Sequence, residues 1–210
     1  MQEHFEEHTV YHIYNRANGE ANVFREEKNY NFFLQRYYKY IDPIAETYAF
    51  CLMPNHFHMM IRVRGVEELD AKTFQKFRTF GMLGSLVSRQ FASLFSSYTQ
   101  AYNKLYGRTG SLFQPNVKRK SVSDEAYFSN LILYIHNNPV KHGFVQDMYD
   151  WPYSSVHLFS ENRKQLSTPV SRGKLLESSS TKRQITDWFG GEDDFFKAHK
   201  QPIDLESVFD

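Results

Sequence analysis

Two histidines flank a phenylalanine at the start of an apolar run, MPNHFHMMI at residues 53–61. Side chains at positions i and i+2 of a β-strand project from the same face, so His56 and His58 can converge on one ion while Phe57 points into the core. Imidazole nitrogens favour zinc or another transition metal, and an added oxygen donor extends the choice to manganese or magnesium. The pair therefore predicts a divalent-metal site, with an ordinary structural or surface pair of histidines as the alternative.

A tyrosine and an asparagine with complementary chemistry follow in LYIHNNPV at 133–140. Tyr134 and Asn138 are four residues apart and share one face of a helix. A tyrosine hydroxyl facing a metal is a nucleophile, and an amide oxygen one turn later is a third ligand. The alternatives are a half-buried aromatic for Tyr134 and a capping or pre-proline role for Asn138. His136 projects from another face, where a solvated position is favoured over a structural or DNA-proximal one.

A small sheet and its helices must hold these side chains. Strand-forming residues, turn signals and helical spacing of apolar residues give the order β-α-β-β-α-β-α. The expected elements are strand 10–15, helix 26–41, an antiparallel hairpin of strands 44–52 and 56–63, one long helix or two joined ones over 73–105, strand 111–122 bent at Pro115 near a sheet edge, and a helix from 123 that ends at Pro139. This order predicts the α+β class: a ferredoxin-like antiparallel sheet with helices packed on one face, plus a C-terminal helical tail.

The length of 210 residues, 41% of them hydrophobic, predicts one main domain at residues 1–160. Residues 161–210 are expected to form a polar, serine-rich connection to about residue 184 and then an aromatic tail that docks as a short helix. The chain contains no apolar run of about 18 residues, and its single cysteine, Cys51, excludes an internal disulfide. A cytoplasmic protein without a membrane anchor is therefore expected.

Basic residues are concentrated in the middle of the chain, although the net charge is only +1. Residues 71–123 carry 9 Lys or Arg and no Asp or Glu, whereas residues 1–70 carry 7 and 11. The segment is a candidate phosphate-facing surface, with a solvated basic face as the alternative. Asn15 and Arg16, at the end of the first strand, are candidates for base or phosphate contact. The candidate phosphate ligands in the basic segment are Arg89, Lys104, Arg108, Lys118, Arg119 and Lys120.

Several blocks of the sequence together resemble one family. PNHFHMMI, YIHNNPVKHGFV and WPYSS at 151–155 are accompanied by YHIYNRAN near the N-terminus and GSLFQ at 110–114. In this order and spacing the blocks resemble the single-tyrosine HUH transposases, in the branch called REP-associated tyrosine transposases. The resemblance covers about residues 8–160, and the combination is far more specific than any one block.

The resemblance implies a ferredoxin-like domain that nicks and rejoins single-stranded or hairpin DNA through a 5′-phosphotyrosine linkage. His56 and His58 match the ligands of a divalent ion, magnesium or manganese, and Tyr134 matches the nucleophile. Asn138 occupies a ligand position where related insertion-sequence transposases usually have glutamine, which has a longer side chain. Asn138 could therefore bind the ion either directly or through a water molecule. The chain would act as a monomer or homodimer. Two other functions remain open, namely a domesticated hairpin-binding protein without cleavage and a metallohydrolase that uses water as nucleophile.

Overall fold

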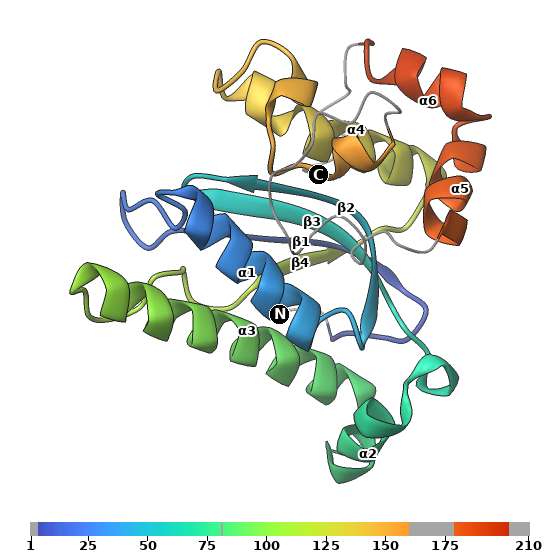
Figure 1. Cartoon of the computed structure of the whole chain (residues 1–210). Coiled ribbons are helices and arrows are strands. Elements are labelled where there is room, and N and C mark those ends of the chain that lie inside the picture. Colours follow the sequence, from blue (N-terminus) through green and yellow to red (C-terminus); the bar gives the residue numbers. More distant parts are fainter. Residues whose placement is uncertain (1–3, 81, 160–178, 202–210) are drawn as a thin grey trace.

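The computed structural model describes residues 4–80, 82–159 and 179–201, and its centre is a four-stranded antiparallel sheet (Figure 1). The sheet has the order β2-β3-β1-β4, and helix α1 connects β1 to β2 while β3 lies between them. This is the split βαβ unit of the predicted ferredoxin-like arrangement, and the antiparallel α+β fold is confirmed. The strands are β1 (Val10–Arg16), β2 (Ala45–Met53), β3 (His56–Val63) and β4 (Lys118–Ser121).

Helices cover both faces of the sheet, so the prediction that they pack on one face is wrong (Figure 1). β2 and β3 are buried along almost their whole length, because their apolar residues do not alternate with polar ones and both faces need a cover. Phe33, Phe57 and Leu86 belong to one hydrophobic cluster, and Met60 and Leu131 belong to the other. One face carries α1 (Glu27–Tyr40) and α3 (Leu83–Tyr106), and the other carries α4 (Glu125–Lys141), α5 (Ser179–Trp188) and α6 (Glu192–Ala198).

Three predicted boundaries change in the structure. The helical stretch after the hairpin is two helices, α2 (Ala71–Phe80) and α3, which was one of the two alternatives. The predicted strand at 111–122 is reduced to β4, because Pro115 lacks an N–H and Asn116 adopts a left-handed φ of 59° that breaks the extended chain. β4 does lie at the sheet edge, as predicted. Pro139 lies inside α4 rather than ending it, because a proline in the last turn removes only one hydrogen bond.

The WPYSS block covers the outer edge of β2. The backbone N–H of Leu52 donates to the carbonyl of Tyr153 at 2.9 Å, and the indole N–H of Trp151 donates to the carbonyl of Leu52 at 2.9 Å. Short 3-10 helices at Val66–Glu68 (η1), Met148–Asp150 (η2) and Ser155–Leu158 (η3) lie in the connections around the sheet. The block is therefore a cap on an edge strand, which would otherwise expose unpaired backbone groups.

A chain of buried hydrogen bonds connects the C-terminal helices to the centre of the fold. His199 on α6 donates from Nδ1 to the carbonyl of Phe195 at 2.7 Å, so the neutral ring accepts at Nε2, which lies 2.8 Å from His136 Nδ1. His136 accepts at Nε2 from the Ser155 hydroxyl at 2.8 Å, and Ser155 Oγ accepts from the N–H of Phe50 at 2.8 Å. His136 is 0% exposed, so the solvated position favoured for it is wrong.

The tail docks as predicted, but its helical part starts earlier. α5 begins at residue 179, inside the stretch expected to be a polar connection, and the rest of that stretch, 160–178, lies outside the described residues. Ile185 and Phe195 join the same hydrophobic cluster as Tyr134 on α4. Within the described residues, no helix is long and apolar enough to cross a bilayer.

Candidate functional site

The two histidines of the HFH segment and the helix-borne tyrosine meet at the start of β3. His56 and His58 project from the same face of the strand, with ring centroids 5.3 Å apart and ring planes nearly perpendicular. The Tyr134 hydroxyl lies 3.4 Å from His58 Nε2, a long contact between two buried side chains. The structure therefore brings the predicted nucleophile and both predicted ligands to one place, although they come from sequence positions far apart.

Asn138 completes the group from one helical turn further along α4. Its Oδ1 lies 3.1 Å from His56 Nε2. The side chain is 0% exposed, and its Nδ2 is a buried amide without a hydrogen-bond partner. Within the described residues, no group of three His, Cys, Asp or Glu ligand atoms includes His56 or His58, so the amide oxygen is the third protein donor at hand.

Burial keeps the imidazoles of the site neutral. It lowers the pKa of His56 to about 4, against a partly opposing contribution from its contact with Asn138. Burial, with a smaller contribution from the neighbouring His12, lowers the pKa of His58 well below its ordinary value. A neutral imidazole offers a lone pair, so both rings are in the form that a metal ion requires at neutral pH.

The same burial works against ionisation of the tyrosine. Burial raises the pKa of the Tyr134 phenol, and the neighbouring Asn138 side chain partly offsets this rise. The Lys141 amino group lies 5.1 Å from the ring centroid, over its face. Tyr134 is therefore protonated in this conformation, and the predicted role of nucleophile would require a partner that takes its proton.

Three aromatic residues at the site were not predicted as functional. His12 and Tyr14 project from β1 on the same face as His58; the His12 Nε2 atom lies 2.9 Å from His58 Nδ1, and the Tyr14 ring stacks on His58 with centroids 5.7 Å apart. The His142 ring lies 5.0 Å from that of His56. The i, i+2 spacing of His12 and Tyr14 is visible in YHIYN, but only the pairing of β1 with β3 shows that it faces the HFH segment.

A cavity of about 470 Å³ opens beside the histidines. Arg16 and Lys118 line it together with His56 and His58, which gives it a positively charged rim. Tyr134, 4% exposed, is not among the lining residues of the described chain. The predicted nucleophile therefore contacts His58 but does not line this cavity in the described conformation.

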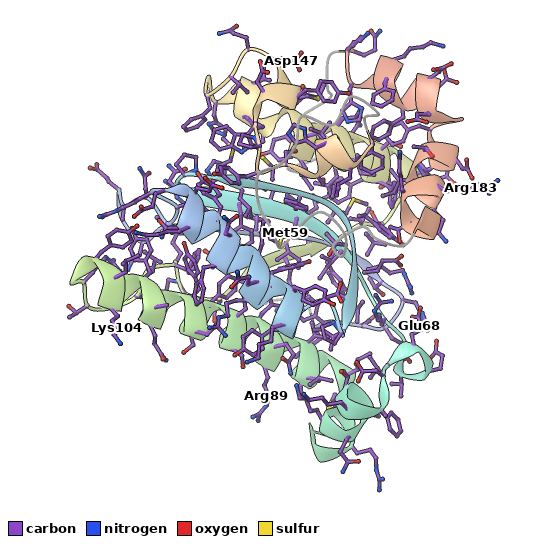
Figure 2. The ribbon with its side chains drawn as sticks, viewed as in Figure 1. Met59, Glu68, Arg89, Lys104, Asp147 and Arg183 are labelled. Carbon is purple, nitrogen blue, oxygen red and sulfur yellow. The ribbon has the colours of Figure 1, made fainter. Side chains whose placement is uncertain are left out.

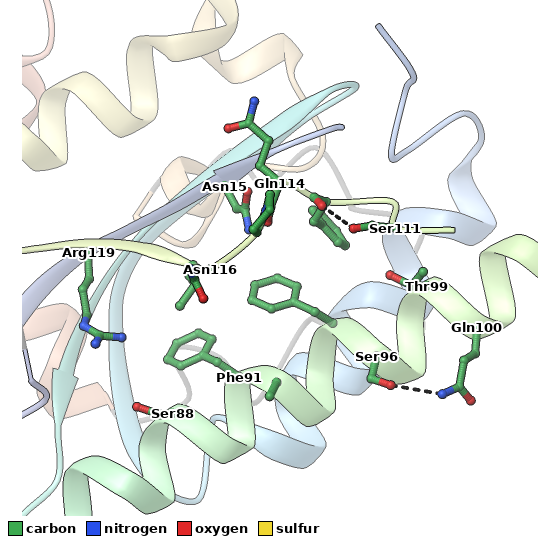
Figure 3. Close-up of a pocket in the computed structure, with 15 residues that line it drawn as sticks. Asn15, Ser88, Phe91, Ser96, Thr99, Gln100, Ser111, Gln114, Asn116 and Arg119 are labelled. Carbon is green, nitrogen blue, oxygen red and sulfur yellow. Dashed lines mark hydrogen bonds between the residues drawn. The ribbon is translucent and has the colours of Figure 1, made fainter. Parts of the chain in front are cut away.

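A second cavity of about 510 Å³ adjoins the first, and Asn15 and Gln114 line both. It lies between α3 and the segment 111–119; Figure 3 shows Asn116 and Arg119 on one side and Phe91 on the other. The Asn15 amide donates to the carbonyl of Gln114 at 3.2 Å and accepts from the N–H of Arg16 at 2.7 Å. Asn15 therefore stabilises the ridge between the two cavities through these two hydrogen bonds.

The predicted basic residues divide between different surfaces. On β4, Lys118 lines the histidine cavity and the Lys120 amino group lies over the Tyr127 ring at 4.9 Å, whereas Arg119 projects to the opposite face, over the Phe5 ring at 4.3 Å. The three were expected as one patch, but alternation along the strand separates them.

The basic residues on and after α3 do not reach the histidine site. Figure 2 shows Arg89 and Lys104 projecting from the side of α3 that faces away from the sheet. Arg108 donates to Asn103 Oδ1 at 3.1 Å and to the carbonyl of Ser111 at 3.0 Å, so it holds the turn after the helix. Of the predicted DNA-contacting residues, Asn15, Arg16 and Lys118 line the cavity with His56 and His58.

Comparisons with known proteins give a consistent result. A Haemophilus influenzae (strain KW20 Rd) protein provisionally named a REP-associated tyrosine transposase is 30% identical over 115 residues, which are 53% of this chain and 59% of that protein. The REP-associated tyrosine transposase of Escherichia coli K12 is 34% identical over 47 residues, 22% of this chain and 28% of that protein. The chain thus spans about three fifths of the first relative and just over a quarter of the second. No protein-family profile matches the chain.

A solved structure, described as a REP-associated tyrosine transposase bound to a REP hairpin, has a similar fold. The TM-score is 0.56 at 15% sequence identity, with 79% of this chain and 88% of that chain covered. Two histidines on one strand of an antiparallel sheet, beneath a tyrosine on a helix, are the arrangement expected of a single-tyrosine HUH protein. The chain is thus similar in sequence to part of two REP-associated tyrosine transposases and similar in fold to the solved one.

Proposed function

We propose that the chain is a transposase that nicks and rejoins hairpin-bearing single-stranded DNA, with Tyr134 as nucleophile. The observation that supports this most strongly is the 3.4 Å contact between the Tyr134 hydroxyl and His58 Nε2, next to His56 and Asn138. A structural role alone does not account for a tyrosine, two neutral imidazoles and an unpaired amide gathered beside a basic cavity. The REP hairpin in the related structure indicates the class of DNA.

The donor set fits a divalent ion. His56 Nε2 and Asn138 Oδ1 are already 3.1 Å apart, and the buried amide nitrogen of Asn138 makes no hydrogen bond to the described residues that would hold the side chain in place, so its oxygen can turn toward an ion. Two nitrogens and one amide oxygen leave room for phosphate oxygens, a mixture that suits manganese or magnesium. When bound, the ion would stabilise the negative charge that develops on the scissile phosphate.

The proposed reaction is a transesterification in which Tyr134 replaces the 3′ oxygen on the scissile phosphorus. The Tyr134 oxygen attacks phosphorus and loses its proton, the bond from phosphorus to the 3′ oxygen breaks, and that oxygen leaves as a hydroxyl after gaining a proton. The product is a 5′-phosphotyrosine linkage and a free 3′ end. Because the linkage replaces one phosphate ester by another, a later attack by a 3′ hydroxyl can rejoin DNA without a nucleotide cofactor.

The cavities suggest where the strand runs. Arg16 and Lys118 are placed to neutralise phosphates next to the histidines. The strand would continue over the ridge of Asn15 and Gln114 into the second cavity, where the partly exposed Phe95 ring offers a surface for an unpaired base. Since Tyr134 lies behind His58, cleavage requires that this part of α4 or the His58 ring move when DNA binds.

The test is replacement of Tyr134 by phenylalanine, with Tyr127→Phe as the matched control because Tyr127 is an equally buried tyrosine on the same helix. Each protein is incubated with manganese and end-labelled single strands that carry the repeats flanking the gene, then run on a denaturing gel. We expect a covalent adduct on the 5′ end of the cut strand with the unmodified protein and Tyr127→Phe, and none with Tyr134→Phe.

Two results would contradict the proposal in different ways. Cutting that persists in Tyr134→Phe without an adduct would identify water as nucleophile and make the protein a metallohydrolase. Hairpin binding without cutting by the unmodified protein would identify a domesticated binding protein.

A further inference from the structure

His12 lies directly behind one of the proposed metal ligands and has no part in the function proposed above. It is 2% exposed and occupies β1, next to β3 in the sheet. His12 Nε2 and His58 Nδ1 are 2.9 Å apart, and among the described residues this is the only hydrogen bond of either nitrogen. Between two neutral imidazoles such a bond has one donor and one acceptor, so its direction fixes where the proton of each ring lies.

The two directions have opposite consequences for the site. If His58 Nδ1 carries the proton and donates to His12, then His58 Nε2 has a lone pair on the side of Tyr134 and can bind an ion. If His12 Nε2 donates instead, His58 carries its proton on Nε2, and that nitrogen cannot be a ligand. Metal ligation through Nε2 therefore needs an acceptor at the position of His12 Nε2.

The surroundings hold His58 in this orientation. The Tyr14 ring stacks on His58 at an interplanar angle of 22°, and the His12 ring lies against Tyr14 with centroids 4.7 Å apart. The three side chains form one layer across β1 and β3, closed on the other side by Tyr134. Because His12 is buried, solvent is poorly placed to replace it as the acceptor, and its loss would leave the Nδ1–H of His58 buried and unpaired.

We propose that His12 is a positioning residue that accepts the Nδ1 proton of His58 and thereby holds the Nε2 lone pair of His58 toward the metal position. This inference rests on the proposed function, because it assigns His58 Nε2 as a metal ligand. It adds a residue outside the HFH segment to the metal site and predicts that β1 contributes to metal affinity without touching the ion.

The experiment uses the full chain and two measurements. Manganese affinity is measured by calorimetric titration of the unmodified protein, His12→Phe, His12→Gln and His199→Phe. Phenylalanine keeps a ring against Tyr14 but removes the acceptor, whereas the glutamine side chain keeps an acceptor at a similar reach. His199→Phe is the matched control, because it removes a buried histidine that makes the same kind of contact, 2.8 Å from His136, away from the ligands. Two-bond proton–nitrogen correlations of the histidine rings report the tautomer of His58, assigned by comparison with His58→Gln.

We expect His12→Phe to lower manganese affinity about 10- to 100-fold, the usual effect of losing such an outer partner. His12→Gln should recover most of the affinity, and His199→Phe should leave it unchanged. In the metal-free unmodified protein, His58 should carry its proton on Nδ1. Equal affinity in His12→Phe and the unmodified protein, or a proton on Nε2 of His58, would overturn the inference while leaving the metal site in place. Absence of manganese binding by the unmodified protein would instead refute the metal-dependent function, and the role of His12 with it.

Discussion

Replacing Ser155 with alanine should lower the free energy of unfolding by several kcal/mol, because this hydroxyl is the central member of a buried chain. Ser155 is 0% exposed, accepts from the N–H of Phe50 and donates to His136 Nε2, both at 2.8 Å. Alanine leaves both groups buried without a partner. Each such orphan costs about 1–3 kcal/mol, so the expected loss is about 2–6 kcal/mol, a large fraction of the stability of an ordinary domain.

Urea unfolding followed by tryptophan fluorescence measures this loss. The matched control is Ser88→Ala, because the Ser88 hydroxyl is exposed and donates only to the carbonyl of Gly84 within its own helix. The control should change the unfolding free energy by less than about 0.5 kcal/mol, as exposed substitutions usually do. A loss below about 1 kcal/mol in Ser155→Ala would refute the assigned direction of the hydrogen-bond chain, since it would mean that neither partner is left unsatisfied.

Three further outcomes can be measured. Excess chelator should abolish cleavage while hairpin binding persists, and cleavage at an unchanged rate would remove the metal from the mechanism. Lys118→Ala should weaken binding to all hairpins alike and reduce the log–log salt slope by about one, whereas Lys104→Ala, on the far side of α3, should leave the slope unchanged; equal slopes in both variants would refute the placement of the strand. Burial lowers the pKa of His199 to about 4 in the folded chain, whereas the unfolded histidine titrates near about 6.5. The free energy of unfolding should therefore be unaffected by this histidine above about pH 6.5 and fall by about 1.4 kcal/mol per pH unit as the pH drops from about 6.5 to about 4. The urea midpoint is measured at about pH 7 and about pH 5 for the unmodified protein and for His199→Gln. An equal drop in the two proteins would show that protonation of His199 does not cause the loss of stability.

Local periodicity was enough to predict the central residues of the site. The i, i+2 spacing of His56 and His58 and the i, i+4 spacing of Tyr134 and Asn138 each place two side chains on one face of one element. The structure shows that these two faces meet. His12 could not be assigned in this way, because its partner is decided by the register of β1 against β3, which depends on the whole sheet.

The errors have similar physical causes. The apolar runs of β2 and β3 do not alternate with polar residues and so indicate a sheet buried on both faces, whereas the order of the elements alone does not decide how the helices divide between those faces. Alternation along a strand places the middle residue of the KRK triplet on the opposite face, so Arg119 does not share a surface with Lys118 and Lys120. The burial of His136 depends on α6, which is far away in the sequence and packs over α4 only in the folded chain.

The segment 151–155 that caps β2 should protect the chain from self-association, which matters for shortened fragments and for the newly made chain. Until residues 151–155 dock, β2 is a nine-residue edge strand whose backbone can pair with another copy of itself. A fragment that ends before Trp151 would retain His56, His58, Tyr134 and all four strands, yet it should self-associate. During synthesis the same edge stays open until this late segment has left the ribosome, so the final step of sheet completion is also the step that protects the protein from aggregation.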